Sequence, residues 1–115
     1  MRGAGALALF AAATSLSACS SGSSSGALEH KACVEVRHSI ALFTSAAHET
    51  GARASATRTA ALTILRTALT PAALASADDA DYQALSATLS ESSRVPEGQL
   101  LVALRAQCAA VLTSS

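Results

Sequence analysis

Aromatic side chains are almost absent from this 115-residue sequence, which contains two phenylalanines, one tyrosine and no tryptophan. Sites that stack nucleic-acid bases or line a sugar pocket depend on aromatic rings, so the composition argues against both kinds of site. Charge is also scarce, and eight basic and eight acidic residues give a formal net charge of zero. Because the chain has no strongly basic field, we expect no nucleic-acid partner.

The usual signatures of enzyme active sites are missing as well. The six glycines form neither a phosphate-binding loop nor a dinucleotide fingerprint. Serines are abundant, but none lies in a Gly-x-Ser-x-Gly elbow, and no Ser-x-x-Lys pair of the lactamase type occurs beyond residue 18. A small domain with short loops also offers little preorganised cavity. We therefore expect a protein that is not an enzyme and that holds no cofactor.

The most informative stretch lies near the N-terminus. After one basic residue, Arg2, the apolar run 3–14 is rich in alanine and leucine. This run is shorter than the roughly 20 residues that a membrane-spanning helix needs. Small residues at Ser17 and Ala18 follow, and they allow a signal peptidase to approach the backbone. The layout is typical of an N-terminal signal peptide.

The four residues Leu16-Ser17-Ala18-Cys19 resemble the lipobox of bacterial lipoproteins, in which an aliphatic residue and two small residues precede an obligatory cysteine. The resemblance implies cleavage between Ala18 and Cys19, which removes residues 1–18. It also implies that the Cys19 sulfur carries a diacylglyceryl group, with a further acyl chain possible on the new N-terminus. The implied partners are membrane lipid and the export and processing machinery, and the implied location is the extracytoplasmic face of a membrane. Ordinary secretion with a leftover cysteine is the alternative.

Residues 19–26 are mainly serine and glycine and are expected to form a flexible tether behind the lipidated cysteine. Residues 27–115 then make up a single domain, because fewer than about a hundred residues remain. In this domain apolar residues recur at helical spacing, and no segment shows the alternation of a strand.

The spacing predicts four helices. The first begins at Ala27 and ends at Thr50-Gly51, with Glu29 on an outer face. Its expected buried stripe contains Leu28, Ala32, Val36, Ile40, Phe43 and Ala47. The second helix follows from Gly51 and is expected to stop at Thr70-Pro71, because proline disfavours helical geometry in the preceding residue.

A short turn at residues 71–74 is expected to lead into a third helix capped by Ser76, with Asp78, Asp79 and Asp81 in its first turns. Pro96 is expected to open the fourth helix, whose inward face contains Leu100, Leu101, Leu104, Cys108 and Val111. Four helices with short connections predict an all-α fold, a small up-down antiparallel four-helix bundle.

The remaining two cysteines, Cys33 and Cys108, form an even number in a chain that is expected to be exported. Cys33 lies near the start of the first predicted helix and Cys108 near the end of the fourth. Those two ends are neighbours in an up-down bundle, so we predict a disulfide that closes almost the whole domain into one loop. Two buried free thiols are the alternative.

Histidine and cysteine side chains of this domain are candidate metal ligands. His30 lies one helical turn from Cys33, but a tetrahedral metal site lacks a fourth ligand, and a disulfide beside a surface histidine is favoured. His38 and His48 are consistent with solvated faces.

A calcium loop starting at Asp79 would continue through Asp81 and Gln83. The segment does not match the EF-hand calcium loop, because Ala84 stands where the loop needs a glycine for its turn and Ser90 stands where it needs a bidentate glutamate. The acidic run is therefore interpreted as a helix-start charge cluster.

Arg53, Arg58 and Arg66 lie on the second predicted helix with no acidic residue nearby in sequence. They are expected to pair with the acidic residues of the third helix, and contact with anionic lipid headgroups is the alternative.

The sequence as a whole favours a membrane-anchored cell-envelope lipoprotein with a non-enzymatic binding or structural role. The expected partner is an unidentified envelope protein or the cell wall. Small alanine-rich envelope lipoproteins of high-GC bacteria resemble this chain in composition and in the cysteine pair. Two alternatives remain: a carrier or sensor that holds a small ligand or metal in the bundle core, and a surface inhibitor or immunity-like lipoprotein.

Overall fold

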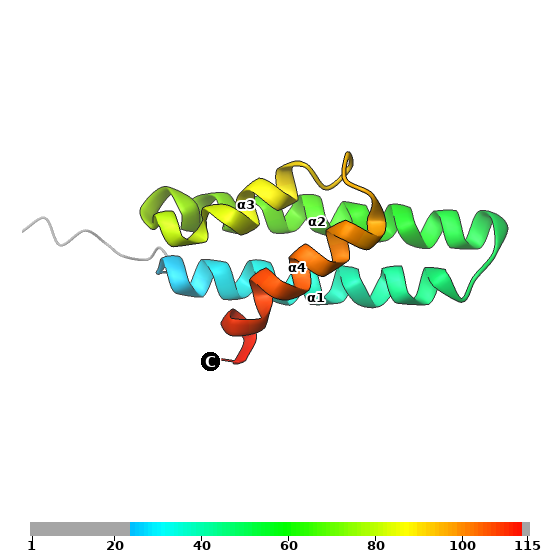
Figure 1. The fold of residues 1–115 in the computed structure, drawn as a ribbon, viewed down its shortest axis with the longest axis horizontal. Coiled ribbons are helices and arrows are strands. Elements are labelled where there is room, and N and C mark those ends of the chain that lie inside the picture. The colour runs from blue at the N-terminus through cyan, green and yellow to red at the C-terminus, as the bar shows by residue number, and fades with distance from the viewer. Residues whose placement is uncertain (1–23, 114–115) are drawn as a thin grey trace, which may run out of the picture.

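The computed structural model describes residues 24–113, which form four α-helices and one short 3-10 helix (Figure 1). The elements in chain order are α1 (Ser25–Ala47), α2 (Gly51–Asp78), η1 (Ala80–Tyr82), α3 (Gln83–Ser90) and α4 (Glu97–Thr113). Residues 24–113 contain no strand, so the predicted all-α class is confirmed.

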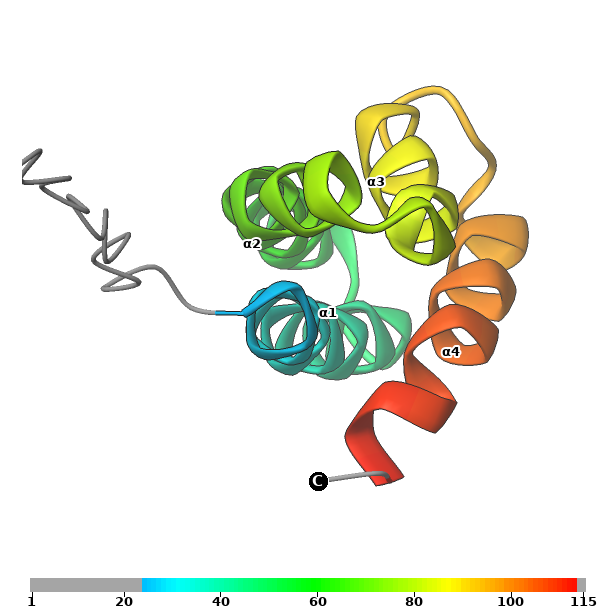
Figure 2. The ribbon, with the colours of Figure 1, turned by 90° about the vertical axis from the view of Figure 1, so that its left-hand side faces the viewer.

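The helices run up and down around a common core. α1 and α2 form a long antiparallel hairpin, α3 packs against α2, and α4 returns across α1 (Figures 1 and 2). α4 crosses α1 at an oblique angle, and its last turn extends past α1 (Figure 1). The predicted up-down four-helix bundle is confirmed.

The first helix starts within the segment expected to be tether. Ser24 is the N-cap residue of α1, and its hydroxyl oxygen accepts a hydrogen bond from the Ala27 backbone N–H at 3.2 Å. A serine cap satisfies one of the otherwise unpaired N–H groups at a helix start. The helix therefore includes Ser25 and Gly26 and begins two residues earlier than expected.

Pro71 does not end the second helix, so that prediction was wrong. α2 continues without interruption to Asp78, and Pro71 is itself buried. Proline removes one backbone hydrogen bond and clashes with the preceding turn, at a cost of about 3 kcal/mol. Burial of Ala72 and Ala75 beyond the proline gives tertiary packing that offsets this cost.

The predicted start of the third helix was also wrong. Ser76 lies inside α2, where its hydroxyl donates to the Ala73 carbonyl. The chain leaves α2 at Asp79, whose Oδ1 accepts a hydrogen bond from the Asp81 N–H at 3.0 Å and caps η1. α3 begins only at Gln83, because Asp79 and Asp81 lie in the connection between the helices and not in a first turn of α3.

Small residues dominate the contact between α1 and α2. Ala32, Ala61 and Ala68 are completely buried, and the Ser39 hydroxyl donates to the Ala61 carbonyl at 2.8 Å. Because alanine adds so little volume, the helix backbones can approach closely. The hydrogen bond from Ser39 then holds the register of the hairpin.

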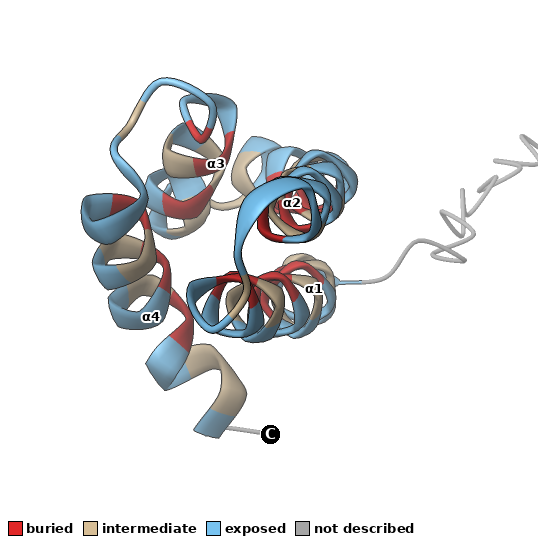
Figure 3. Cartoon of the chain, turned by 90° about the vertical axis from the view of Figure 1, so that its right-hand side faces the viewer, coloured by how far each residue is buried: buried red, intermediate tan, exposed pale blue. Residues whose placement is uncertain are grey.

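The larger apolar side chains fill the space between the hairpin and the other two helices. The buried cluster contains Val36, Phe43, Leu65, Leu85, Leu89, Leu100 and Leu104. Buried positions form continuous stripes on the inward faces of the helices (Figure 3). One predicted core residue, Ala47, is exposed, and Ala46 is buried in its place.

By length and composition alone, α2 is long and apolar enough to cross a membrane. In this structure the helix packs one face against α1 and α3, so it serves as a core helix of the bundle. Its exposed positions include three threonines, Thr59, Thr63 and Thr67.

Candidate functional site

The disulfide between Cys33 and Cys108 is present, as predicted. It joins α1 to α4 across a sequence separation of 75 residues, with the two Cα atoms 5.4 Å apart. Both residues are buried, at 0% and 3% exposure. The bond fixes the last helix against the first at the end of the bundle where α1 begins.

The residues of the lipobox resemblance lie outside the described part of the chain. These include Cys19, expected to carry lipid, and Ala18, expected to precede the cleavage site. Their assignment therefore stays a prediction from sequence.

The histidine and cysteine side chains considered for a metal are not arranged as a ligand set. Both sulfurs are joined in the disulfide, so neither is available as a thiolate next to His30. Across residues 24–113, no group of three or more His, Cys, Asp or Glu side chains is placed to hold a metal ion. The described residues therefore identify no candidate metal centre.

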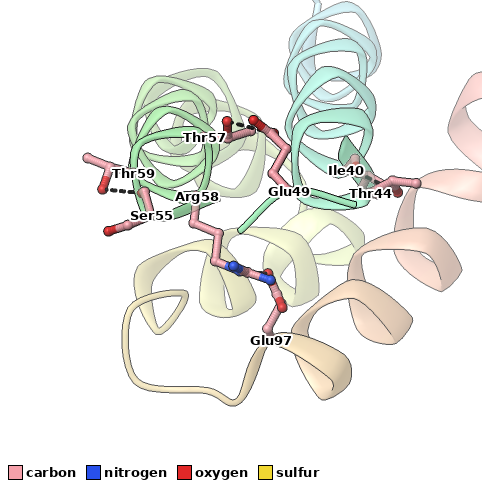
Figure 4. Close-up of polar contacts among 8 residues, drawn as sticks. All are labelled: Ile40, Thr44, Glu49, Ser55, Thr57, Arg58, Thr59 and Glu97. Atoms are coloured by element: carbon pink, nitrogen blue, oxygen red, sulfur yellow. Dashed lines mark hydrogen bonds and ion pairs between the residues drawn. The ribbon is translucent and has the colours of Figure 1, made fainter. Parts of the chain in front are cut away.

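The arginines of α2 do not pair with the acidic residues of the predicted third helix, so that assignment was wrong. Arg53 Nε lies 2.9 Å from Glu49 Oε2, at the turn between α1 and α2. Arg58 Nε lies 3.1 Å from Glu97 Oε1, at the start of α4 (Figure 4). Arg66 forms no ion pair with any residue in the described range. The partners differ from the prediction because the acidic run is at the opposite end of α2.

The Arg58–Glu97 pair lies at the rim of a surface hollow of about 360 Å³. Its apolar wall is formed by Phe43, Leu62, Val95 and Leu100, and Ser92 and Ser93 complete the lining. The hollow is therefore built from α1, α2, α4 and the segment before α4. We call it the Phe43 hollow.

The Phe43 hollow has the mixed chemistry of a recognition site. Its volume is within the range of about 300–1,000 Å³ that is usual for ligand sites. The side chains of Arg58 and Glu97 are each 40% exposed, so both remain accessible to a partner. An exposed ion pair of this kind contributes at most about 1 kcal/mol to stability. The pair can therefore exchange its bond for contacts with a bound molecule at little cost to the fold.

Threonine hydroxyls on α1 and α2 form further hydrogen bonds within the α1–α2 hairpin. The Thr57 hydroxyl donates to Glu49 Oε1 at 2.9 Å, which connects α2 to the turn that follows α1 (Figure 4). With Arg53 bound to its second oxygen, the Glu49 carboxylate has a partner at each oxygen. Thr44 and Thr59 instead bond to the backbone of their own helices, through the Ile40 and Ser55 carbonyls.

The sequence interpretation missed a buried carboxyl, because it placed Glu29 on an outer face. Glu29 is only 3% exposed, and its Oε2 has no hydrogen-bond partner. Burial raises the pKa of this carboxyl from 4.5 to about 7, because desolvation disfavours the charged form. The Glu29 carboxyl therefore changes between its protonated and ionised forms near neutral pH.

The position of Glu29 explains its burial. It precedes Cys33 by one helical turn, and Cys33 is joined to α4. Gly26, one turn earlier, has the Tyr82 hydroxyl 3.6 Å from the point where a Cβ would lie. Glu29 is thus on the face of α1 that turns toward η1 and α4. The spacing of four between Glu29 and Cys33 is the sequence signal that could have revealed this face, because a disulfide-bonded cysteine is expected to face another helix.

Within residues 24–113, two other buried side-chain oxygen atoms lack hydrogen-bond partners. They are Glu35 Oε2 on α1 and Gln107 Oε1 on α4. The amide nitrogen of Gln107 does have a role, because it donates to Thr88 Oγ1 at 2.8 Å and connects α4 to α3.

No protein-family model matches this chain, and no curated protein or solved structure shows significant similarity to it.

Proposed function

We propose that this protein is a lipid-anchored cell-envelope lipoprotein whose helical domain binds a partner protein without catalysis. The observation that carries the proposal is the motif Leu16-Ser17-Ala18-Cys19 behind a short apolar run. The anchor would be a diacylglyceryl group on Cys19, and residues 1–18 would be removed during export.

The disulfide supports export independently of that motif. Disulfides persist in oxidising compartments and are rare where cellular reductants keep thiols reduced. A bond between Cys33 and Cys108 is therefore in keeping with a domain that works outside the cytoplasm.

The geometry of the bundle supports a binding role at a distance from the membrane. The proposed anchor precedes α1, which has 23 residues and is thus about 34 Å long. Phe43 is roughly 27 Å along that helix, so the Phe43 hollow is near the end of the bundle farthest from the start of α1. A hollow in this position would face a partner in the envelope.

The anchor is tested by replacing Cys19 with serine and fractionating the cells. The unchanged chain is expected in the membrane fraction, with a diacylglyceryl group on an N-terminal cysteine by mass spectrometry. Cys19→Ser is expected to lose the modification and leave the membrane fraction, because serine has no sulfur atom to form the thioether bond with the diacylglyceryl group. Ser20→Ala is the matched control and should behave like the unchanged chain. Membrane retention of Cys19→Ser, or an unacylated chain that begins at Met1, would contradict the anchor.

The binding role is tested by site-specific photo-crosslinking in intact cells. A photoreactive residue at Ser93 samples the Phe43 hollow, and one at Thr63 samples the exposed face of α2 as a control. We expect one discrete crosslinked protein from position 93 and none from position 63. Identical patterns from both positions would refute a role for the hollow. A hydrolase as the crosslinked neighbour would favour the inhibitor alternative instead.

A further inference from the structure

A second hollow lies between α1 and α4, beside the disulfide, on a different part of the surface from the Phe43 hollow. Its volume is about 210 Å³. The apolar part of its lining includes Val36, Ile40, Cys108 and Ala109. We call it the α1–α4 groove. It exists because α4 crosses α1 obliquely and is held there by the disulfide (Figure 1).

Two arginines provide all the charge in this groove. Arg37 comes from α1 and Arg105 from α4, and both line the groove. Ion pairs in the described residues involve Arg53, Arg58 and Arg94, so neither groove arginine has an acidic partner there. The groove therefore combines an aliphatic floor with two available guanidinium groups.

The hydrogen-bonding character of the lining restricts what can bind. A guanidinium group has five N–H donors and accepts no hydrogen bond. The other side chains of the lining are apolar. A peptide segment would bring backbone N–H groups into the groove, where the lining side chains offer no acceptor for them. An alkyl chain brings no such groups, and a carboxylate head has only acceptors, which match the two arginines.

We propose that the α1–α4 groove binds a long-chain carboxylate, with its alkyl chain on the aliphatic floor and its head group between Arg37 and Arg105. This inference goes beyond the proposed function, because it assigns a ligand class to a second site on the folded domain.

The volume favours a single chain. Sites for drug-sized molecules usually have volumes of about 300 Å³ or more, and this groove is smaller. It accommodates part of one alkyl chain, while a lipid with two chains would leave one of them in water. The apolar run 3–14 of the chain itself is a poor occupant, because it contains no acidic residue to meet the arginines.

The test is calorimetric titration of the full chain carrying Cys19→Ser, so that no attached lipid competes for the groove. Dodecanoate, kept at monomeric concentrations, is expected to bind with a stoichiometry of one. Dodecanol has the same chain without the charge, and butanoate has the same charge with a short chain. Both are expected to bind at least about tenfold more weakly, because each lacks one of the two matched features.

Substitutions locate the binding site. Arg37→Gln and Arg105→Gln are each expected to weaken dodecanoate binding by about tenfold, the usual effect of one charge-assisted hydrogen bond. Arg66→Gln is the matched control, because Arg66 is an exposed arginine on α2 without an ion pair. Ala109→Phe places a bulky side chain in the groove from an exposed position and is expected to abolish binding. If Ala109→Phe does not fold, the two arginine variants decide the result.

Three outcomes would overturn the inference. One is equal binding of dodecanoate and dodecanol, and another is equal affinity of the groove variants and Arg66→Gln. The third is binding to phosphatidylglycerol vesicles without any binding of monomeric dodecanoate, which would make the groove a membrane contact. The titration uses an unlipidated chain, so absence of dodecanoate binding would not contradict the lipid anchor on Cys19. In the same way, a result that contradicts the anchor would not contradict ligand binding in the groove.

Discussion

Replacing Glu29 by glutamine isolates the energetic cost of the buried carboxyl group. Glu29 is 3% exposed and its Oε2 has no hydrogen-bond partner, so the charged form is poorly solvated in the folded protein. Glutamine keeps the size and shape of the side chain and cannot ionise. The variant should therefore lose the pH dependence of stability that the carboxyl causes.

The sign and size of the effect follow from the pKa. Burial raises the pKa of the Glu29 carboxyl from 4.5 to about 7. Below pH 4.5 the group is protonated in both the folded and the unfolded chain and has no effect on stability. As the pH rises toward 7, the unfolded chain releases its proton first, so the free energy of unfolding falls. The total loss is roughly 3 kcal/mol, because each pKa unit corresponds to about 1.4 kcal/mol.

Urea unfolding followed by circular dichroism measures this loss directly. The full chain carrying Cys19→Ser is compared with the same chain carrying Glu29→Gln, from about pH 4 to about pH 8. At the low end the two should unfold at similar urea concentrations. At the high end Glu29→Gln should be more stable by up to roughly 3 kcal/mol.

Asp78→Asn is the matched control, because it removes an exposed carboxylate of the same domain. In this variant the free energy of unfolding should change between the two ends of the pH range by the same amount as in the reference chain. If the reference chain and Glu29→Gln show the same change in stability with pH, the reasoning about the buried carboxyl is wrong. The reasoning would also be wrong if the reference chain lost stability as the pH falls and Glu29→Gln did not, because the effect of the carboxyl on stability would then have the opposite sign.

Three further predictions concern stability and use the same unfolding assay. Replacing Cys33 and Cys108 together by alanine opens a loop with a separation of 75 residues and should cost about 4 kcal/mol; a cost below about 1 kcal/mol would contradict the loop-entropy argument. Gly51→Ala should cost about 1 kcal/mol because Gly51 has a φ of 59°, whereas Gly98→Ala in α4 should be neutral or slightly stabilising; equal effects would argue against backbone strain. Leu104→Ala should cost about 2–5 kcal/mol, since Leu104 is 0% exposed, and a smaller loss would mean that the core closes around the cavity.

Helical periodicity was sufficient to predict the class of fold. The spacing of Ala32, Val36 and Phe43 predicted the buried face of α1, and all three are buried. The disulfide between Cys33 and Cys108 also followed from sequence, because an up-down order of helices brings those two ends together. These features depend on short-range spacing and on chain order, which can be read from residue types alone.

The helix boundaries were less predictable. Proline disfavours a helix locally, yet α2 continues through Pro71 because the residues beyond it are buried against other helices. The acidic run beginning at Asp78 has the composition of a helix start, yet most of it forms the turn through η1. In both places tertiary packing outweighed local preference.

The candidate sites depended most on the folded arrangement. Residue types and their order along the chain specified the helices, the cysteine pair and the motif at Cys19, because each is a property of neighbouring residues or of chain order. Only the packed helices placed Glu29 in the interior, brought Arg58 to Glu97, and made Arg37 and Arg105 line the same groove. The reason is physical: burial and ion pairing act between side chains far apart in sequence, and the angle at which two helices cross decides which of them meet.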